Sequence, residues 1–136
     1  MKRVMLMMLV LCMSSCASAE MIETKYFSLD VPEGWTVSEE GNVITVTAGD
    51  KSGSLSITAD HPDGKTIAQL AEEYSARLKG SEPEQDEDGG YTFEFNNGVS
   101  QAVIDGDEDL YVLIIGTGID RNGEVLAEIL ESLEMK

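Results

Sequence analysis

Polar and apolar residues alternate in several short stretches of the chain, and this two-residue period is typical of a β-strand with one buried face. Phe27, Leu29 and Val31, for example, alternate with polar neighbours. The same pattern, together with enrichment in β-branched residues, predicts four strands near the start of the chain. They cover residues 25–31, 35–37, 43–48 and 55–59, and turns are expected at 32–34, 39–42 and 49–53.

The period then changes to that of an amphipathic helix. Apolar residues recur three and four positions apart at Ile67, Leu70, Ala71, Tyr74 and Leu78. Thr66 precedes them and Gln69 follows three residues later, which predicts a capping box at the start of the helix. Gly80 is expected to be the left-handed residue that ends it. Residues 81–90 are polar and acidic and predict a loop.

Three further strands and a second helix are predicted in the last third of the chain. Strands at 91–95 and 99–104 are separated by Asn97-Gly98, which is typical of a two-residue hairpin. A charged tip at 105–109 leads into the apolar run 110–115, which predicts a strand covered on both faces. The last helix has one apolar stripe, formed by Leu126, Ile129, Leu130 and Leu133. Antiparallel strands in runs, with separate helices, predict an α+β fold.

The first nineteen residues have the layout of a secretory signal peptide. Lys2 and Arg3 precede an apolar run over 4–13, and small residues follow up to Ala19. The apolar run is too short to span a bilayer. We therefore expect an exported protein, located in the periplasm or at the cell surface.

Two cleavage sites are compatible with this segment. Cleavage after Ala19 would release a single domain of residues 20–136, and small residues at Ala17 and Ala19 favour it. Met13-Ser14-Ser15-Cys16 resembles a lipobox, and cleavage there would leave a lipid anchor on Cys16. In both cases the folded domain would contain neither a free thiol nor a disulfide, which excludes thiol chemistry.

The chain is strongly acidic. It contains 26 Asp and Glu residues against 9 Lys and Arg, a formal net charge of −17. Removal of the signal peptide would take away two basic residues and no acidic ones. Such a surface repels nucleic-acid phosphates and anionic lipid headgroups. We therefore expect no nucleic-acid binding, and membrane attachment only through lipid on Cys16.

Residues 26–35, Tyr-Phe-Ser-Leu-Asp-Val-Pro-Glu-Gly-Trp, resemble the opening of the PsbP-like proteins, many of which are small exported bacterial proteins and lipoproteins. The order of predicted elements is similar over residues 20–136. The resemblance implies a twisted antiparallel sheet of about six or seven strands sandwiched between helices, an α/β/α arrangement. It also implies an accessory or binding role without catalysis. Pro32, Gly34 and Trp35 match the motif, and we expect them to end a strand, permit a turn and anchor the core.

His61 is the single histidine of the chain and the first candidate for chemistry. With Asp60 and Asp63 it could form a metal site, because imidazole and carboxylate groups bind divalent ions. A Pro-Asp-Gly turn between strand and helix explains the same residues, and we favour it. The chain contains no Gly-x-Ser-x-Gly motif that would pair a nucleophilic serine with His61.

Asp105, Asp107 and Asp109 are the second candidate because they begin like a calcium-binding loop. Leu110 and Gly116 occupy the positions where an EF-hand has glycine and glutamate, so the EF-hand pattern is not met. We interpret this segment as a charged hairpin tip, and no cofactor is predicted elsewhere. The function expected from the sequence is a non-enzymatic module of the cell envelope that binds a protein partner. The alternative is an exported domain that binds a small ligand or calcium.

Overall fold

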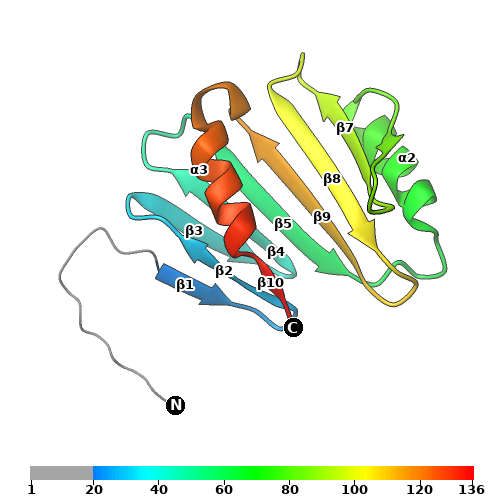
Figure 1. Cartoon of the computed structure of the whole chain (residues 1–136), viewed down its shortest axis with the longest axis horizontal. Coiled ribbons are helices and arrows are strands. Elements are labelled where there is room, and N and C mark those ends of the chain that lie inside the picture. Colours follow the sequence, from blue (N-terminus) through cyan, green and yellow to red (C-terminus); the bar gives the residue numbers. More distant parts are fainter. Residues whose placement is uncertain (1–19) are drawn as a thin grey trace.

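The structure, a computed structural model, describes residues 20–136. The predicted signal peptide, with its two cleavage sites at Cys16 and Ala19, lies outside the described residues. Within them the chain forms two antiparallel sheets and two helices (Figure 1). Neither helix is long and apolar enough to cross a membrane. The predicted α+β class is confirmed.

The larger sheet contains seven of the strands of the described chain. They are β3 (Trp35–Glu40), β4 (Val43–Ala48), β5 (Ser54–Asp60), β6 (Glu84–Gln85), β7 (Tyr91–Phe95), β8 (Ser100–Gly106) and β9 (Tyr111–Thr117). Their order across the sheet is β3-β4-β5-β9-β8-β7-β6. The smaller sheet has the order β1-β2-β10 and consists of β1 (Glu20–Glu23), β2 (Phe27–Val31) and β10 (Glu134–Met135). Helix α2 (Ile67–Leu78) follows β5, and α3 (Ile119–Ser132) follows β9.

The two helices cover opposite faces of the larger sheet, and each face has its own apolar core (Figure 1). On one face, α3 and β2 pack against β4 and β5; the buried residues there are Phe27, Leu29, Val31, Ile44, Val46, Leu55, Ile57, Ala59, Leu126 and Ile129. On the other face, α2 packs against β7, β8 and β9; the buried residues are Leu70, Ala71, Phe93, Ala102, Ile104, Tyr111 and Leu113. This arrangement confirms the predicted sandwich of a seven-stranded sheet between helices.

The first predicted strand is confirmed, but it lies in the smaller sheet and begins at Phe27 rather than at Lys25. Its neighbours β1 and β10 were not predicted from the sequence. Both are short and mostly exposed, and they become strands only because β2 offers them hydrogen-bonding partners. After β2, Pro32 ends the strand and Gly34 has a φ of +90°, as the resembling motif implied. Trp35 is half-buried and packs against the first core.

Helix α2 begins as predicted and ends differently. Gln69 N donates to Thr66 Oγ1 over 3.1 Å, and Thr66 N donates to Gln69 Oε1 over 2.9 Å, which confirms the capping box. The left-handed residue at the other end is Lys79, with a φ of +58°, so the prediction of Gly80 was wrong. A Cβ on Gly80 would lie 2.9 Å from the carbonyl oxygen of Glu94. Glycine is therefore favoured there by the close approach of β7.

The predicted two-residue hairpin between β7 and β8 was also wrong. Phe95 pairs with Ser100, so four residues form the loop. Asn96, Asn97 and Gly98 have φ values of +54°, +57° and +84°. Asparagine and glycine tolerate this conformation better than other residues, which explains why three can follow one another. The Asn-Gly signal located the turn but did not give its length.

Several strand boundaries also differ from the predictions. Strand β3 continues to Glu40, which leaves Gly41 and Asn42 as a two-residue turn. Strand β9 covers 111–117 instead of 110–115, and the acidic loop 81–90 contains the short strand β6. Helix α3 begins at Ile119 and is kinked at Asn122, whose φ of −119° and ψ of 15° are not helical. For the strands, pairing with a neighbouring strand decides the boundary, and the local pattern does not.

Candidate functional site

A pocket of about 320 Å³ lies where the smaller sheet meets one end of the larger sheet. We call it the Tyr26 pocket. Its lining comes from the loop between β1 and β2, the turn between β3 and β4, and the end of β5. The lining residues are Thr24, Lys25, Tyr26, Phe27, Glu39, Gly41, Asn42, Ile44, Ala59 and Asp60. The pocket therefore joins segments that lie far apart in the sequence.

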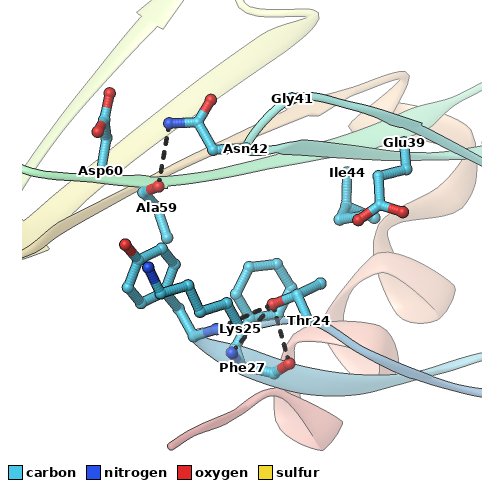
Figure 2. A pocket seen from close by; sticks show the side chains of 10 residues that line it. Thr24, Lys25, Phe27, Glu39, Gly41, Asn42, Ile44, Ala59 and Asp60 are labelled. Atoms are coloured by element: carbon cyan, nitrogen blue, oxygen red, sulfur yellow. Dashed lines mark hydrogen bonds between the residues drawn. The ribbon is translucent and has the colours of Figure 1, made fainter.

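Hydrogen bonds between side chains and the backbone hold the two walls of this pocket in place. Thr24 Oγ1 accepts from the backbone N–H groups of Tyr26 and Phe27 over 3.2 and 3.1 Å, and it donates to Phe27 O. This arrangement is a local turn stabilised by a side-chain hydroxyl. On the opposite wall, Asn42 Nδ2 donates to Ala59 O over 3.2 Å (Figure 2). The first wall is thus fixed within its own turn, and the second is tied to the neighbouring strand β5.

The floor of the Tyr26 pocket is apolar and its rim is charged. Phe27, Ile44 and Ala59 belong to the first core and are buried. Lys25 and Glu39, on the rim, are exposed. The ammonium nitrogen of Lys25 lies 5.2 Å from the centre of the Tyr26 ring, within the range of a cation–π interaction. An apolar floor with a few polar groups around it is the usual construction of a ligand site.

His61 lies beside this pocket and connects three segments. Its Nδ1 is 2.8 Å from Asp109 O, and its Nε2 is 3.4 Å from the hydroxyl of Tyr26. A backbone carbonyl only accepts hydrogen bonds, so Nδ1 donates to Asp109 O, and Nε2 forms its contact with the Tyr26 hydroxyl. The two rings also make an edge-to-face contact, with centroids 6.2 Å apart. His61 therefore ties the end of β5 to the β1–β2 loop and to the tip of the β8–β9 hairpin.

A smaller hollow of about 160 Å³ lies on the α2 side of the same end of the sheet. The hydroxyl groups of Tyr74 and Tyr111 are 2.9 Å apart in it, and the guanidinium carbon of Arg77 is 5.1 Å from the centre of the Tyr74 ring. Burial of Tyr111, and then its hydrogen bond to Tyr74, raise the pKa of the Tyr111 hydroxyl. Tyr111 is therefore neutral at physiological pH, and its hydrogen bond to Tyr74 joins α2 to β9.

Asp60, His61 and Asp63, the first metal candidate, form the turn that the sequence predicted. Asp60 Oδ1 accepts from the backbone N–H of His61 over 2.8 Å. Asp63 and Gly64 have φ values of +54° and +85°, and Lys65 N donates to Pro62 O. Among residues 20–136, no group of three or more His, Cys, Asp or Glu side chains is arranged to hold a metal ion. The three residues are thus neighbours in a turn whose polar groups stabilise its backbone.

Asp105, Asp107 and Asp109, the calcium candidate, lie at the tip of the β8–β9 hairpin. Asp107 Oδ1 accepts from the backbone N–H groups of Asp109 and Leu110 over 2.8 and 3.0 Å. These two hydrogen bonds lower the pKa of Asp107. Asp105 Oδ1 accepts from Gly106 N over 2.7 Å. The carboxylates of Asp105 and Asp107 therefore bind the backbone of the tip.

The comparisons with known proteins were made in sequence and in structure. No protein-family model matches the chain, and no curated protein matches it in sequence. Among solved structures, the chain is similar to cyanobacterial PsbP (CyanoP) from Synechocystis sp. PCC 6803, with a TM-score of 0.59 and 18% sequence identity. The similarity covers 94% of this chain and 99% of the cyanobacterial protein. The fold is PsbP-like. The resemblance inferred from residues 26–35 is confirmed at the level of the fold.

Sequence reasoning identified His61 and its turn but missed the other walls of the Tyr26 pocket. Tyr26 was assigned only to a strand, and Asn42 only to a turn. Tyr111 lies in an apolar run that predicts a buried strand. A buried tyrosine hydroxyl usually has a hydrogen-bonding partner, so this hydroxyl was the one feature of the sequence that indicated a polar contact there. The position of that partner, Tyr74, depends on how α2 packs on the PsbP-like sheet.

Proposed function

We propose that this chain is an exported, non-enzymatic accessory module of the bacterial cell envelope that works by binding a protein partner. The predicted signal peptide supports export, and the PsbP-like fold is compatible with an accessory role. Export, the envelope location and the protein partner are the proposal, since similarity at 18% identity establishes the fold alone.

The observation that carries the proposal is that His61 connects two loops through its ring nitrogens. Both of its ring nitrogens form hydrogen bonds that connect loops, one to Asp109 O and one to the Tyr26 hydroxyl. These contacts fix the shape of the surface around the Tyr26 pocket. A surface whose polar groups hold its own loops in place is suited to recognition.

The test is cross-linking of single-cysteine variants in living cells that export the protein. Residues 20–136 contain no cysteine, so each variant would carry one defined attachment point in this region for a photoreactive thiol reagent. Suitable exposed positions are Glu39 at the Tyr26 pocket, Glu72 on α2 and Ala127 on α3. We expect one protein to be cross-linked reproducibly, and more strongly from one position than from the other two.

The partner must then bind the purified protein in a direct titration. A chain without cysteine, treated with the same reagent, controls for cross-links that do not come from the introduced positions. Absence of a reproducible product from all three positions would contradict the proposal. Turnover of a substrate by the purified protein, lost in a His61→Gln variant, would contradict its non-enzymatic part.

The volume of the Tyr26 pocket favours a second candidate function, binding of a small ligand. A pocket of about 320 Å³ is at the lower end of the range for small-molecule sites. A thermal-shift screen of small polar compounds, repeated with an Ala59→Leu variant that fills the floor, tests this function. A compound that stabilises the unmodified protein and not the variant would support it. Equal stabilisation of both would place the compound outside the pocket.

A further inference from the structure

An apolar groove runs beside α3 on the face of the larger sheet that this helix only partly covers. Its volume is about 200 Å³, and we call it the α3 groove. The floor includes Val103 of β8 and Ile114 of β9. The wall is the side of α3 that carries Ile119, Gly123, Ala127 and Leu130. Val103, Ile114 and Leu130 remain partly exposed, although most aliphatic residues on this face are buried.

The strand register shows why this groove is open. Directly paired residues share a face, and one such row crosses the sheet from Ile57 through Ile114 and Val103 to Thr92. Ile57, at one end of the row, is fully buried beneath α3 and β2. Thr92, at the other end, pairs with Glu84 of the edge strand β6. The cover supplied by α3 therefore ends part-way along the row, and β8 and β7 remain uncovered on this side (Figure 1).

Carboxylates border the groove on both sides. On the strand side, Glu94 pairs with Gln101 of the groove lining and is exposed, and Glu84 is exposed at the edge. A hollow lined by both of these residues continues from Gln101. On the helix side, Glu124 and Glu131 lie three and four residues from Ala127, so they share its side of the helix.

These four carboxylates have no basic partner within the described chain. The ion pairs of residues 20–136 are Lys65–Glu73 and Lys136–Glu23, and neither involves the border of the α3 groove. The formal charge of the whole chain is −17, so the surroundings do not compensate the border either. An apolar floor between two acidic borders is complementary to a segment with apolar residues at its centre and basic residues on its flanks.

We propose that the α3 groove binds a basic, amphipathic segment of a partner protein. One or two aliphatic side chains of this segment insert between Val103 and Ala127, and Lys or Arg residues face the acidic borders. A second copy of this acidic chain would bring like charges together, and an anionic membrane would be repelled. The inference rests on the proposed function, because it names the surface and the partner chemistry of a binding module.

The test uses the protein recovered from cells that export it and a labelled synthetic peptide of leucine and lysine, patterned as an amphipathic helix. Two control peptides have glutamate in place of lysine, or the same composition without the amphipathic pattern. We expect binding of the first peptide only, weakened by added salt because exposed ion pairs are screened. Amide NMR shifts of the isotope-labelled protein should change around Val103, Ile114 and Ala127.

Matched variants separate the groove floor from general effects of charge. Val103→Glu places a carboxylate on the floor, and Val37→Glu makes the same change at an exposed position on the opposite edge strand. We expect Val103→Glu to weaken peptide binding about tenfold or more, since a carboxylate under a bound apolar side chain loses its water. Val37→Glu should change binding less than about twofold, as expected of one distant exposed charge.

A second pair of variants tests the acidic borders. Glu94→Gln combined with Glu131→Gln removes one charge from each side of the groove. Glu33→Gln combined with Glu72→Gln removes the same charge from exposed positions elsewhere. We expect about threefold to tenfold weaker binding for the first pair and little change for the second, as for two exposed ion pairs.

Three results of the peptide experiments would each overturn the inference. They are equal binding of the glutamate peptide, equal effects of Val103→Glu and Val37→Glu, and NMR shifts confined to residues outside the groove. If Val103→Glu does not fold, the NMR map of the unmodified protein still decides. A partner cross-linked from Glu39→Cys or Glu72→Cys, but not from Ala127→Cys, would leave the proposed function standing and contradict the groove. Peptide binding in the groove, without any cross-linked cellular partner, would support the groove as a binding surface and contradict the proposed function.

Discussion

Replacement of Gly118 by alanine is predicted to be one of the most destabilising single-methyl additions in this protein. Gly118 is the residue before α3, with a φ of +76°, and its N–H donates to Val99 O. A Cβ there would collide with the carbonyl oxygen of Ser52 and would lie 2.9 Å from Gly53 Cα. Two costs are therefore combined, the left-handed conformation and the lack of space.

The size of each cost follows from comparison with two other glycines. Gly64 has a φ of +85° but open space around its Cβ position, so Gly64→Ala should cost only the conformational term, about 1–2 kcal/mol. Gly116 has no positive φ, and its Cβ would lie 3.8 Å from Leu126 Cδ1, so Gly116→Ala should change stability by less than about 1 kcal/mol. Gly118→Ala adds overpacking of about 1–3 kcal/mol to the conformational term. We expect a total of about 2–5 kcal/mol.

Urea unfolding followed by the fluorescence of Trp35 measures these changes. Trp35 is the only tryptophan of the chain, and it packs against the first core, so its environment changes on unfolding. The expected order of destabilisation is Gly118→Ala, then Gly64→Ala, then Gly116→Ala. If Gly118→Ala were no more costly than Gly64→Ala, the backbone of Ser52 would have to move away easily. The close packing of the β4–β5 turn against α3 would then be refuted.

Three further predictions concern α2, α3 and the tyrosine pair. Thr66→Ala removes the cap of α2 and should lower the free energy of unfolding by about 1 kcal/mol in the same urea assay, whereas Thr66→Ser should retain most of it. Gly123→Ala should raise that free energy by about 0.5–1 kcal/mol, because the added methyl meets only Ile119 Cγ2 at 3.9 Å. The raised pKa of Tyr111 favours its protonated form in the folded state, so its contribution is present below pH 10.0 and lost as the pH rises further. Urea titrations at increasing alkaline pH should therefore show a shallower loss of stability for Tyr111→Phe, and parallel losses would contradict the assignment.

The sequence was most informative where one element determines its own conformation. Strand β4 begins and ends as predicted because alternate residues between Val43 and Ala48 are buried on one face. The start of α2 was predicted because Thr66 and Gln69 form the capping box without help from other elements. By contrast, β1 and β10 depend entirely on pairing with β2, and the local pattern of these short, mostly exposed segments gives no sign of it.

The candidate sites were less predictable because their residues come from distant parts of the chain. The Pro-Asp-Gly turn after His61 was expected, but the ring of His61 contacts Tyr26, 35 residues earlier, and Asp109, 48 residues later. The α3 groove was not expected at all. The apolar Val103 lies between the buried residues Ala102 and Ile104 and therefore on the other face of β8, and only the position of α3 over that face shows that the helix leaves it partly exposed.

The pairing of β2 with the last described strand determines when this protein can fold. Asp30 N donates to Ser132 Oγ across 102 residues, and Lys136 N donates to Tyr26 O. During synthesis, Phe27, Leu29 and Val31 leave the ribosome long before α3 and β10 exist to cover them. Contacts between such distant residues slow folding, because the chain must lose much entropy before they form. This apolar strand therefore stays uncovered until residues 119–135 have been synthesised, and we expect its contacts with α3 and β10 to form late in folding.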